Sequence, residues 1–408
     1  MAKERCIIVG ASHAAAQLAP TLRQHGYEGS IAVIGDEYFL PYHRPPLSKD
    51  FLAGKKSIDD ILIRPPAVYQ KNNIRFVLGL TVTGIDRANK HLLLDDGEQI
   101  PYDKLVLTVG ARVRRLEVPG VDKKGIFYLR TLADVQQIKA YAGKARHAVI
   151  VGGGYIGLET AASLRKLGME VVVLEALPRV LARVTAPEVS AFYTRVHAEE
   201  GVRIVTDAQV AEFLGDGEVR EVALADGRTF PADLVIIGIG IIPNTEMAAE
   251  AGLEVDNGIV VDEFARTSDP DILAAGDCTC HFNPIYGRRV RLESVQNAVD
   301  QATIAALTLC GQPRPYRALP WFWSDQYDLK LQIAGLSQGY DQVVIRGDIE
   351  RGRSFAAFYL KEGKLLAVDA VNRPQEFMLG KRLIAEGVEV DPSLLRQENF
   401  ALKGLLAR

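Results

Sequence analysis

The strongest constraint on the fold of this chain is a strand–glycine–helix pattern within residues 148–175. Residues 148–151 form a short apolar run, typical of a strand that is buried on both faces. Gly152, Gly154 and Gly157 follow with the G-x-G-x-x-G spacing. In this pattern the first glycine permits a tight turn, the second lets a pyrophosphate approach the backbone, and the third lets the helix pack close to the strand. The pattern predicts a nucleotide-binding βαβ unit.

The residues after the glycines continue the same unit. Apolar residues recur every three positions from Leu158 to Leu167, which predicts a helix with one apolar stripe, and Gly168 is placed to end it. A second strand is predicted at residues 171–174, with Glu175 at its carboxyl end, where an acid binds adenosine ribose hydroxyls. The alternative is a tight turn without a ligand. Because all the parts fall in register, they favour a dinucleotide site.

A second copy of this pattern begins near the N-terminus. A predicted strand at residues 6–9 runs into Gly10, a helix and a second strand follow, and Asp36 holds the position that Glu175 holds in the other copy. Ser12 and Ala15 occupy the second and third glycine positions. Alanine is tolerated at the third position, whereas the Cβ of a serine at the second limits the approach of a pyrophosphate. Two such units in one chain predict two nucleotide sites, the layout needed to pass electrons between two cofactors.

The duplication extends to a hairpin in each half. Asp96-Gly97 and Asp226-Gly227 are both typical of hairpin turns, and strands are predicted after them at residues 104–107 and 234–237. A further apolar strand at residues 272–275 ends in Gly276-Asp277. An acid at that position can bind a ribityl or ribose hydroxyl.

The segment Leu40-Pro-Tyr-His-Arg-Pro-Pro-Leu-Ser-Lys49 is an uncommon loop. Its three prolines are expected to prevent helix formation and to impose an extended path. The loop is either a rigid connector or a stiff support for cations that bind an anionic ligand, and its chemistry favours neither.

The pattern changes after a proline-rich linker that ends near residue 320. Short strands are predicted at 329–333, 343–346, 354–360 and 365–371, with a helix at 375–386, which together indicate a small α+β domain. Trp321 and Trp323 stand at its entrance, and we expect at least one of them in its core.

Composition narrows the function. The chain has 408 residues and a net charge of −3, which argues against a nucleic-acid or membrane partner. We expect no signal peptide and no membrane span, and the four cysteines indicate reduced thiols and a cytoplasmic location. Cys278, Cys280 and His281 lack a second ligand pair nearby in sequence, so we expect no metal site.

Several longer motifs carry a resemblance to a known family. They are Gly-Gly-Gly-Tyr-Ile-Gly-Leu-Glu, Arg-Pro-Pro-Leu-Ser-Lys, Thr-Ser-Asp-Pro, Gly-Asp-Cys, Glu-Ser-Val-Gln-Asn-Ala and Trp-Phe-Trp-Ser-Asp-Gln. Together they resemble the putidaredoxin reductase family of FAD-containing, NADH-dependent ferredoxin reductases, over residues 7 to about 402. The resemblance implies a glutathione reductase-like α/β fold with two Rossmann-like domains and a C-terminal α+β domain. It implies FAD binding by 1–113 and 241–317, NADH binding by 114–240, and a C-terminal domain at 318–408.

The resemblance also implies a set of site residues. Lys49, paired with Glu159, would place a positive charge near the flavin ring; the alternative is an ordinary salt bridge between domains. The residues that it implies for FAD are Gly10, Ser12, His13, Ala14, Ala15, Asp36, Arg44, Lys49, Val82, Arg130, Asp277, Val295 and Trp321. Those that it implies for NADH are Gly152, Gly154, Tyr155, Ile156, Gly157, Glu159, Glu175, Arg183 and Gly240. Ser12 and Val109 depart from the family pattern.

The implied activity is hydride transfer from NADH to FAD, followed by one-electron transfers to a two-iron, two-sulfur ferredoxin that serves a haem monooxygenase. Arg288, Arg289 and Arg291 form a dense basic cluster, which is either a patch that binds the ferredoxin transiently or a solvated charged loop. We expect the reductase to be a monomer. The chain has no Cys-x-x-Cys pair, so we expect no thiol relay. The alternatives are the reductase of an aromatic-ring dioxygenase, a rubredoxin reductase, and an NADH-sensing protein that resembles apoptosis-inducing factor.

Overall fold

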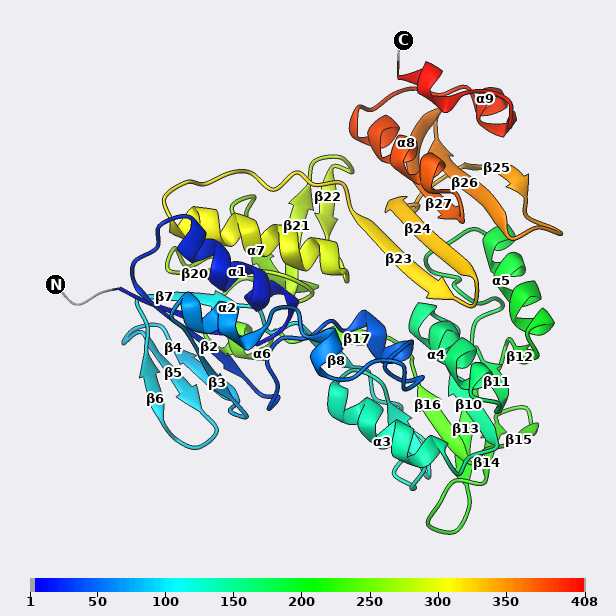
Figure 1. Cartoon of the computed structure of the whole chain (residues 1–408), viewed down its shortest axis with the longest axis horizontal. Coiled ribbons are helices and arrows are strands. Elements are labelled where there is room, and N and C mark those ends of the chain that lie inside the picture. Colours follow the sequence, from blue (N-terminus) through cyan, green and yellow to red (C-terminus); the bar gives the residue numbers. More distant parts are fainter. Residues whose placement is uncertain (1–3, 407–408) are drawn as a thin grey trace. The chain divides into compact units, whose positions relative to one another are not determined.

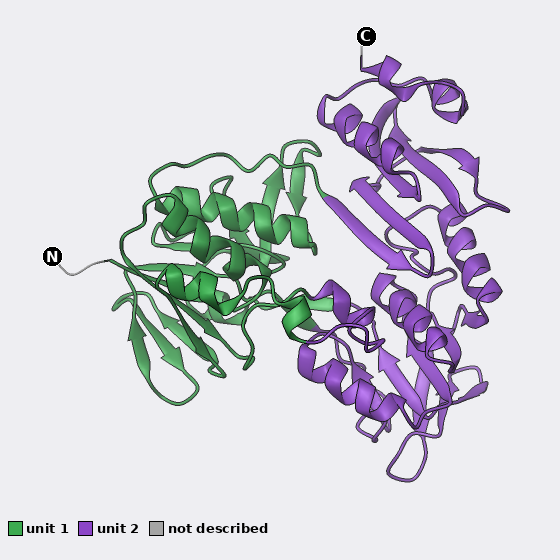
Figure 2. Ribbon diagram, viewed as in Figure 1, with its two compact units in different colours: residues 1–43, 58–112, 241–320 green, residues 44–57, 113–240, 321–408 purple. Residues whose placement is uncertain are grey.

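The computed structural model describes residues 4–406, which fold into two compact units (Figures 1 and 2). Unit 1 is built from segments within residues 1–43, 58–112 and 241–320. Unit 2 is built from segments within 44–57, 113–240 and 321–408. The chain passes between the units near residues 43, 57 and 320 and near β8 (Ala111–Val113) and β17 (Ile241–Pro243). Each unit contains one of the two predicted βαβ patterns.

Unit 1 is centred on a parallel five-stranded sheet. Its strand order is β20 (Ile272–Ala274), β7 (Lys104–Leu107), β1 (Arg5–Val9), β2 (Ser30–Gly35), β3 (Ile74–Leu78). In the central strand β1, Cys6 and Ile8 pack into the core on one face of the sheet, while Ile7 and Val9 pack into the core on the other. This explains why the strand reads as a continuous apolar run.

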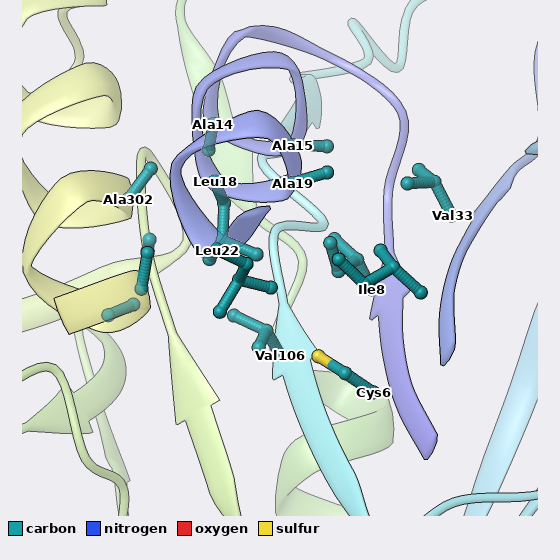
Figure 3. Packing of buried hydrophobic residues seen from close by; sticks show 14 of the residues in the cluster. Cys6, Ile8, Ala14, Ala15, Leu18, Ala19, Leu22, Val33, Val106 and Ala302 are labelled. Carbon is teal, nitrogen blue, oxygen red and sulfur yellow. The ribbon is translucent and has the colours of Figure 1, made fainter. Parts of the chain in front are cut away.

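Helices α1 (His13–Gln24) and α7 (Val295–Leu309) contribute to the core on the first face (Figure 3). The contact is rich in alanine, with Ala15 and Ala19 on α1 and Ala302 on α7 fully buried. Small side chains let the two helices and the sheet approach closely, and Leu18 and Leu22 fill the space above the strands.

Smaller elements complete unit 1. A three-stranded antiparallel sheet contains β4 (Val82–Asp86), β5 (His91–Leu94) and β6 (Gln99–Pro101). A four-stranded sheet contains β18 (Val255–Asp256), β19 (Gly258–Val261), β21 (Thr279–Asn283) and β22 (Arg288–Val290). Both sheets contribute to the core on the second face of the parallel sheet, where Ile7 and Val9 pack. The remaining described helices of unit 1 are α2 (Pro66–Lys71), α6 (Glu246–Glu250) and the 3₁₀ helix η2 (Asp59–Ile61).

Unit 2 repeats the parallel sheet. The order is β12 (Val202–Val205), β11 (Glu170–Leu174), β10 (His147–Val151), β16 (Leu234–Ile237), β9 (Ile126–Tyr128). Its helices are α3 (Leu132–Ala142), α4 (Tyr155–Lys166), α5 (Pro187–Glu199) and the 3₁₀ helix η1 (Pro45–Ser48). A second antiparallel sheet, β13 (Val210–Leu214), β14 (Glu221–Leu224) and β15 (Thr229–Pro231), shares a core with the parallel strands.

The C-terminal part of unit 2 is an antiparallel sheet with helices. The strand order is β23 (Trp321–Gln326), β24 (Leu329–Gly335), β27 (Lys364–Val371), β26 (Ser354–Lys361), β25 (Gln342–Asp348). The helices are α8 (Pro374–Ala385), α9 (Pro392–Arg396) and the 3₁₀ helix η3 (Leu402–Leu405). This agrees with the predicted α+β domain.

Three expectations from the sequence are wrong. The proline loop is not extended throughout, because Pro45 and Pro46 begin η1, where a missing N–H is tolerated. The linker ends in a strand that we did not predict, β23. Neither Trp321 nor Trp323 is fully buried. Instead their rings contact each other, with centroids 5.6 Å apart.

The boundaries at 113, 240 and 317 stay a prediction, but one segment is grouped differently from them. Residues 44–57 belong to unit 2, whereas we placed them in the first part of the FAD domain.

No described helix is long and apolar enough to cross a membrane. Within residues 4–406, no group of three histidine, cysteine or acidic side chains could hold a metal ion. Cys6 and Cys278 are buried, and burial raises the pKa of each thiol to about 12.

A buried carboxylate lies in the core of unit 2. Asp369 on β27 is 1% exposed, and its Oδ2 accepts hydrogen bonds from Tyr359 at 2.5 Å and Thr185 at 2.7 Å. Its Oδ1 has no hydrogen-bond partner among the described residues. Burial is the main cause that raises the pKa of Asp369 to about 6.

We predict that Asp369→Asn weakens the pH dependence of stability between pH 5 and pH 7. Because the folded-state pKa lies above the unfolded one, the folded wild type binds more protons, and it loses stability as pH rises through this range. The asparagine cannot ionise and does not lose stability in this way. Relative to the wild type, the free energy of unfolding of the variant should therefore rise by about 1 kcal/mol from pH 5 to pH 7. Urea unfolding at both pH values measures the change. If the free energies of unfolding of the two proteins differ by the same amount at pH 5 and pH 7, the pKa of Asp369 is not raised.

Candidate functional site

The first candidate site lies at the carboxyl edge of the sheet in unit 1. Gly10 follows β1 with a φ of +102°, and a Cβ there would lie 2.3 Å from the carbonyl oxygen of Thr108. A side chain therefore cannot replace this glycine. Asp36 follows the parallel neighbour β2 and is exposed, as a ligand-binding acid at this edge must be.

The residues after Gly10 begin helix α1. Ser12 is its N-cap residue, and the buried residues His13, Ala14 and Ala15 form its first turn. The first backbone N–H groups of a helix favour an anion, so this turn suits a pyrophosphate. Ala15, at the third glycine position, is fully buried in the core of unit 1.

Asp277 and Val295 lie at the ends of other elements of unit 1. Asp277 follows β20 and Gly276, and it is half-buried. A Cβ on Gly276 would lie 3.6 Å from the Cβ of Ala298 and 3.7 Å from that of Ala14, so α1, α7 and the Gly276 turn meet there. Val295 is the first residue of α7. Val82 begins β4 and is half-buried.

The second candidate site lies at the carboxyl edge of the parallel sheet in unit 2. Gly152 has a φ of +110°, and a Cβ there would meet the carbonyl oxygen of Gly238 at 2.3 Å. Gly157 touches the turn from the helix side, because a Cβ would lie 2.1 Å from the oxygen of Gly152. A Cβ on Gly154, by contrast, would point into open space. The three glycines thus have the three separate roles that the motif predicts.

Glu175 at the end of β11 is held by the backbone. Its Oε2 accepts from the N–H of Gly153 at 2.6 Å, and its Oε1 accepts from Leu177 at 2.8 Å. These bonds fix the carboxylate beside the glycine turn. Each oxygen can still accept another hydrogen bond, for example from a ribose hydroxyl. Arg183 is exposed, and its Nη2 lies 3.7 Å from where a Cβ on Gly240 would be.

The ion pair between Lys49 and Glu159 is the most buried charged contact among the predicted site residues. Lys49 Nζ lies 2.9 Å from Glu159 Oε1, with side-chain exposures of 17% and 2%. The same Oε1 accepts from the hydroxyl of Ser324 at 2.6 Å, and Oε2 accepts from Ser48 at 2.6 Å. Three donors therefore offset the cost of burying the carboxylate.

Sequence reasoning did not assign Ser48, Ser324, Gln326 or His197 to the site. Gln326 Nε2 donates to Ser324 at 3.2 Å, and Gln326 Oε1 lies 2.9 Å from His197 Nε2. The signal for the first three was present, because they belong to the two motifs Arg-Pro-Pro-Leu-Ser-Lys and Trp-Phe-Trp-Ser-Asp-Gln. His197 on α5 carries no such signal.

The remaining predicted residues of unit 2 lie on neighbouring loops and strands. Arg44 donates to the carbonyl oxygen of Arg130 at 2.7 Å. Tyr155 and Ile156 form the first turn of α4, with Ile156 exposed and the ring of Tyr155 5.0 Å from that of Phe322. Trp321 begins β23, and the ammonium of Lys381 lies 5.2 Å from its ring centroid.

A cavity of about 160 Å³ in unit 2 opens beside the ion pair. Its lining includes Lys49, Glu159, Ser163, Lys166, Gln326 and Tyr327. The cavity gives Lys49 access to solvent, whereas Ser324 behind Glu159 is fully buried.

The fold and the two glycine turns define a class of α/β protein with two dinucleotide-binding domains. The chain belongs to the pyridine nucleotide-disulphide oxidoreductase family, whose model matches residues 4–302, and residues 321–406 match the reductase C-terminal family. This confirms the predicted fold class and the resemblance to putidaredoxin reductase.

Individual relatives match over the whole chain. Putidaredoxin reductase of Pseudomonas putida is 46% identical, covering 100% of this chain and 97% of the relative. The ferredoxin reductase subunit of 5,5'-dehydrodivanillate O-demethylase from a Sphingobium species is also 46% identical, covering 98% of each. The reductase in the crystal structure of the covalent putidaredoxin reductase–putidaredoxin complex has a TM-score of 0.96 and 45% identity, covering 100% of this chain and 99% of that one.

Both glycine turns fit the dinucleotides that the family implies. Gly154 leaves open space where a pyrophosphate would approach the backbone, and an acid stands at the end of the next strand in each unit. Ser12 replaces the second glycine in unit 1, but as the N-cap residue of α1 it leaves the helix N-terminus able to bind an anion.

We predict that Gly154→Ala and Gly157→Ala separate binding from stability. Gly154→Ala should cost less than about 1 kcal/mol of stability, because its methyl group meets no atom, yet it should weaken NAD⁺ binding at least about tenfold by blocking the pyrophosphate. Gly157→Ala should instead destabilise the protein by about 1–3 kcal/mol through overpacking. Calorimetric titration with NAD⁺ and urea unfolding distinguish the two. Wild-type affinity in Gly154→Ala would refute the placement of the pyrophosphate.

Proposed function

We propose that this protein is an NADH-dependent ferredoxin reductase that binds FAD in unit 1 and NADH in unit 2. The observation that carries the proposal is the presence of two glycine-turn sites, each followed by an acid at the end of the next strand. The family supports it, since two relatives at 46% identity are named putidaredoxin reductase and ferredoxin reductase subunit, and a third at 41% identity is named ferredoxin–NAD(+) reductase component.

We assign the predicted residues to two groups. In unit 1, the first turn of α1, Asp36, Val82, Asp277 and Val295 would hold FAD. In unit 2, residues 152–157, Glu175, Arg183 and Gly240 would hold NADH. We also assign four residues of unit 2 to flavin binding, namely Arg44, Lys49, Arg130 and Trp321. Glu159 would pair with Lys49.

The bound flavin supplies hydride acceptance from NADH and release of electrons one at a time. Lys49 would hold a positive charge close to the ring, which favours the negative charge that develops there on reduction. Glu159 would fix the direction of that ammonium. The hydroxyls of Ser48 and Ser324, which both donate to Glu159, belong to buried residues and exclude water from its inner side.

The acceptor that we propose is a two-iron, two-sulfur ferredoxin, bound transiently to a monomeric reductase in the cytoplasm. The crystallised complex of a relative with putidaredoxin supports a ferredoxin partner. As the terminal enzyme we propose a haem monooxygenase, with an aromatic-ring dioxygenase as the second candidate.

Anaerobic mixing tests the proposal. The protein as purified should carry one FAD per chain, NADH should bleach its flavin absorbance, and added putidaredoxin should then be reduced. Bleaching without reduction of putidaredoxin, a spinach-type ferredoxin or rubredoxin would contradict the reductase assignment and favour an NADH sensor.

We predict a preference for NADH over NADPH of at least about tenfold in kcat/KM, because Glu175 would face the 2′-phosphate of NADPH and like charges repel. Arg179 cannot easily reach that phosphate. It donates to the carbonyl oxygens of Ala182 and Thr185 and to the hydroxyl of Ser190. The Glu175→Gln variant should show a smaller preference for NADH over NADPH. Measuring kcat/KM with each nucleotide, for the wild type and the variant, tests this. Equal values for the wild type would overturn the assignment of Glu175.

The proposed basic patch lies on the edge strand β22 of unit 1. Arg288 and Arg289 are exposed, and Arg289 stands opposite Phe282, whose side chain is 56% exposed. Arg291 contributes less than we expected, because it is half-buried and lies 2.6 Å from Glu293. Arg289 also pairs with Glu254 at 3.3 Å. The patch is therefore centred on Arg288, Arg289 and Phe282.

We predict that reversing Arg288 and Arg289 to glutamate lowers kcat/KM for the ferredoxin about tenfold at low salt, mainly through the association rate. The effect should fade as salt screens the charges. Ferricyanide reduction by the same variant should be unchanged, and Arg382→Glu, an exposed reversal in unit 2, serves as control. If kcat/KM for the ferredoxin changes neither with salt nor in the double reversal, this patch does not bind the ferredoxin.

A further inference from the structure

The ionised carboxylate of Glu159 determines the direction of a chain of hydrogen bonds behind it. A carboxylate can only accept, so the hydroxyl of Ser324, 2.6 Å from Oε1, must donate its single proton to Glu159. Ser324 can then only accept from Gln326, which must present its amide NH₂ at 3.2 Å. If the amide were reversed, two acceptors would compete for one hydroxyl proton.

His197 is the next member of the chain. The carbonyl oxygen of Gln326 faces His197 Nε2 at 2.9 Å, so this nitrogen must carry the proton. The other ring nitrogen, Nδ1, must then accept from the hydroxyl of Tyr327 at 3.1 Å. Ser324 and His197 are fully buried and Gln326 is 2% exposed, so water does not replace these bonds.

We propose that Tyr327, His197, Gln326 and Ser324 form a one-directional hydrogen-bond chain whose donors all point toward Glu159, and that they act as positioning residues for Lys49. This inference rests on the proposed function only for its effect on the flavin. Aligned donors polarise one another and concentrate positive potential on Oε1. They hold the carboxylate in one orientation, which in turn directs the ammonium 2.9 Å away.

The chain is not a proton path. The amide of Gln326 does not readily pass a proton, and the ionised Glu159 has no proton of its own to release. Burial lowers the pKa of His197 to about 4, so its ring is neutral at pH 7. Proton exchange with solvent is left to the open cavity beside Lys49.

The tautomer of His197 tests the chain without reference to the flavin. Nitrogen-15 NMR of the purified, histidine-labelled protein should show the ring of His197 neutral at pH 7, with Nε2 protonated and Nδ1 unprotonated. Loss of that signal in His197→Asn assigns it. A ring protonated on Nδ1, or charged at pH 6, would overturn the proposed direction.

The positioning role is tested with Ser324→Ala against Ser354→Ala, a control hydroxyl on the same C-terminal sheet that bonds Arg373 and not Glu159. Ser324→Ala should slow FAD reduction by NADH at least fivefold, with NADH affinity changed less than twofold. It should also shift the oxidised–reduced equilibrium of FAD about threefold toward the oxidised form, about 14 mV. Gln326→Leu, a second variant in case Ser324→Ala fails to fold, should change both in the same direction.

Each outcome has a separate meaning. If wild-type FAD is reduced by NADH but Ser324→Ala and Gln326→Leu match Ser354→Ala in rate and potential, the positioning role is wrong and the proposed function stands. If NADH does not reduce the wild type, the proposed function fails, while the tautomer still decides whether the chain exists.

Discussion

One buried carboxylate joins three separate segments of unit 2. Glu159 is 2% exposed, and a buried charge of this kind costs several kcal/mol unless donors surround it. Its donors come from two distant segments, Ser48 and Lys49 in the proline loop and Ser324 in the first strand of the C-terminal sheet. The carboxylate therefore ties these segments to helix α4. This contact, with others such as that of Thr185 with Asp369, joins residues 44–57 and the C-terminal domain to the second nucleotide-binding fold in unit 2.

The same unit contains a second buried carboxylate with a different environment. Glu159 accepts hydrogen bonds on both oxygens, whereas Asp369 leaves Oδ1 without a partner among the described residues. The two cases follow one rule, because burying a carboxylate costs little only when donors match its acceptors. The first acid is built to hold a cation in place. The second makes stability depend on pH.

The local parts of this structure could be predicted from the sequence. Both βαβ units were found because their strands, glycines and terminal acids lie within about thirty residues and follow local backbone rules. The edge of the C-terminal sheet was missed, because β23 begins directly after Pro320 and its two tryptophans suggested a core anchor. The contacts of Glu159 could not be derived from spacing. Its serine partners lie 111 and 165 residues away in the chain, and only folding brings them together.

The central claim is that Lys49 and Glu159 act as one unit in the reduction of the flavin. A double-mutant cycle on the rate constant of FAD reduction by NADH, with Lys49→Met, Glu159→Gln and both together, tests it most directly. We predict that each single change slows reduction and that the double variant is no slower than the slower single one, a coupling of about 1.5 kcal/mol or more. Effects that simply multiply, with a coupling below about 0.3 kcal/mol, would contradict the claim.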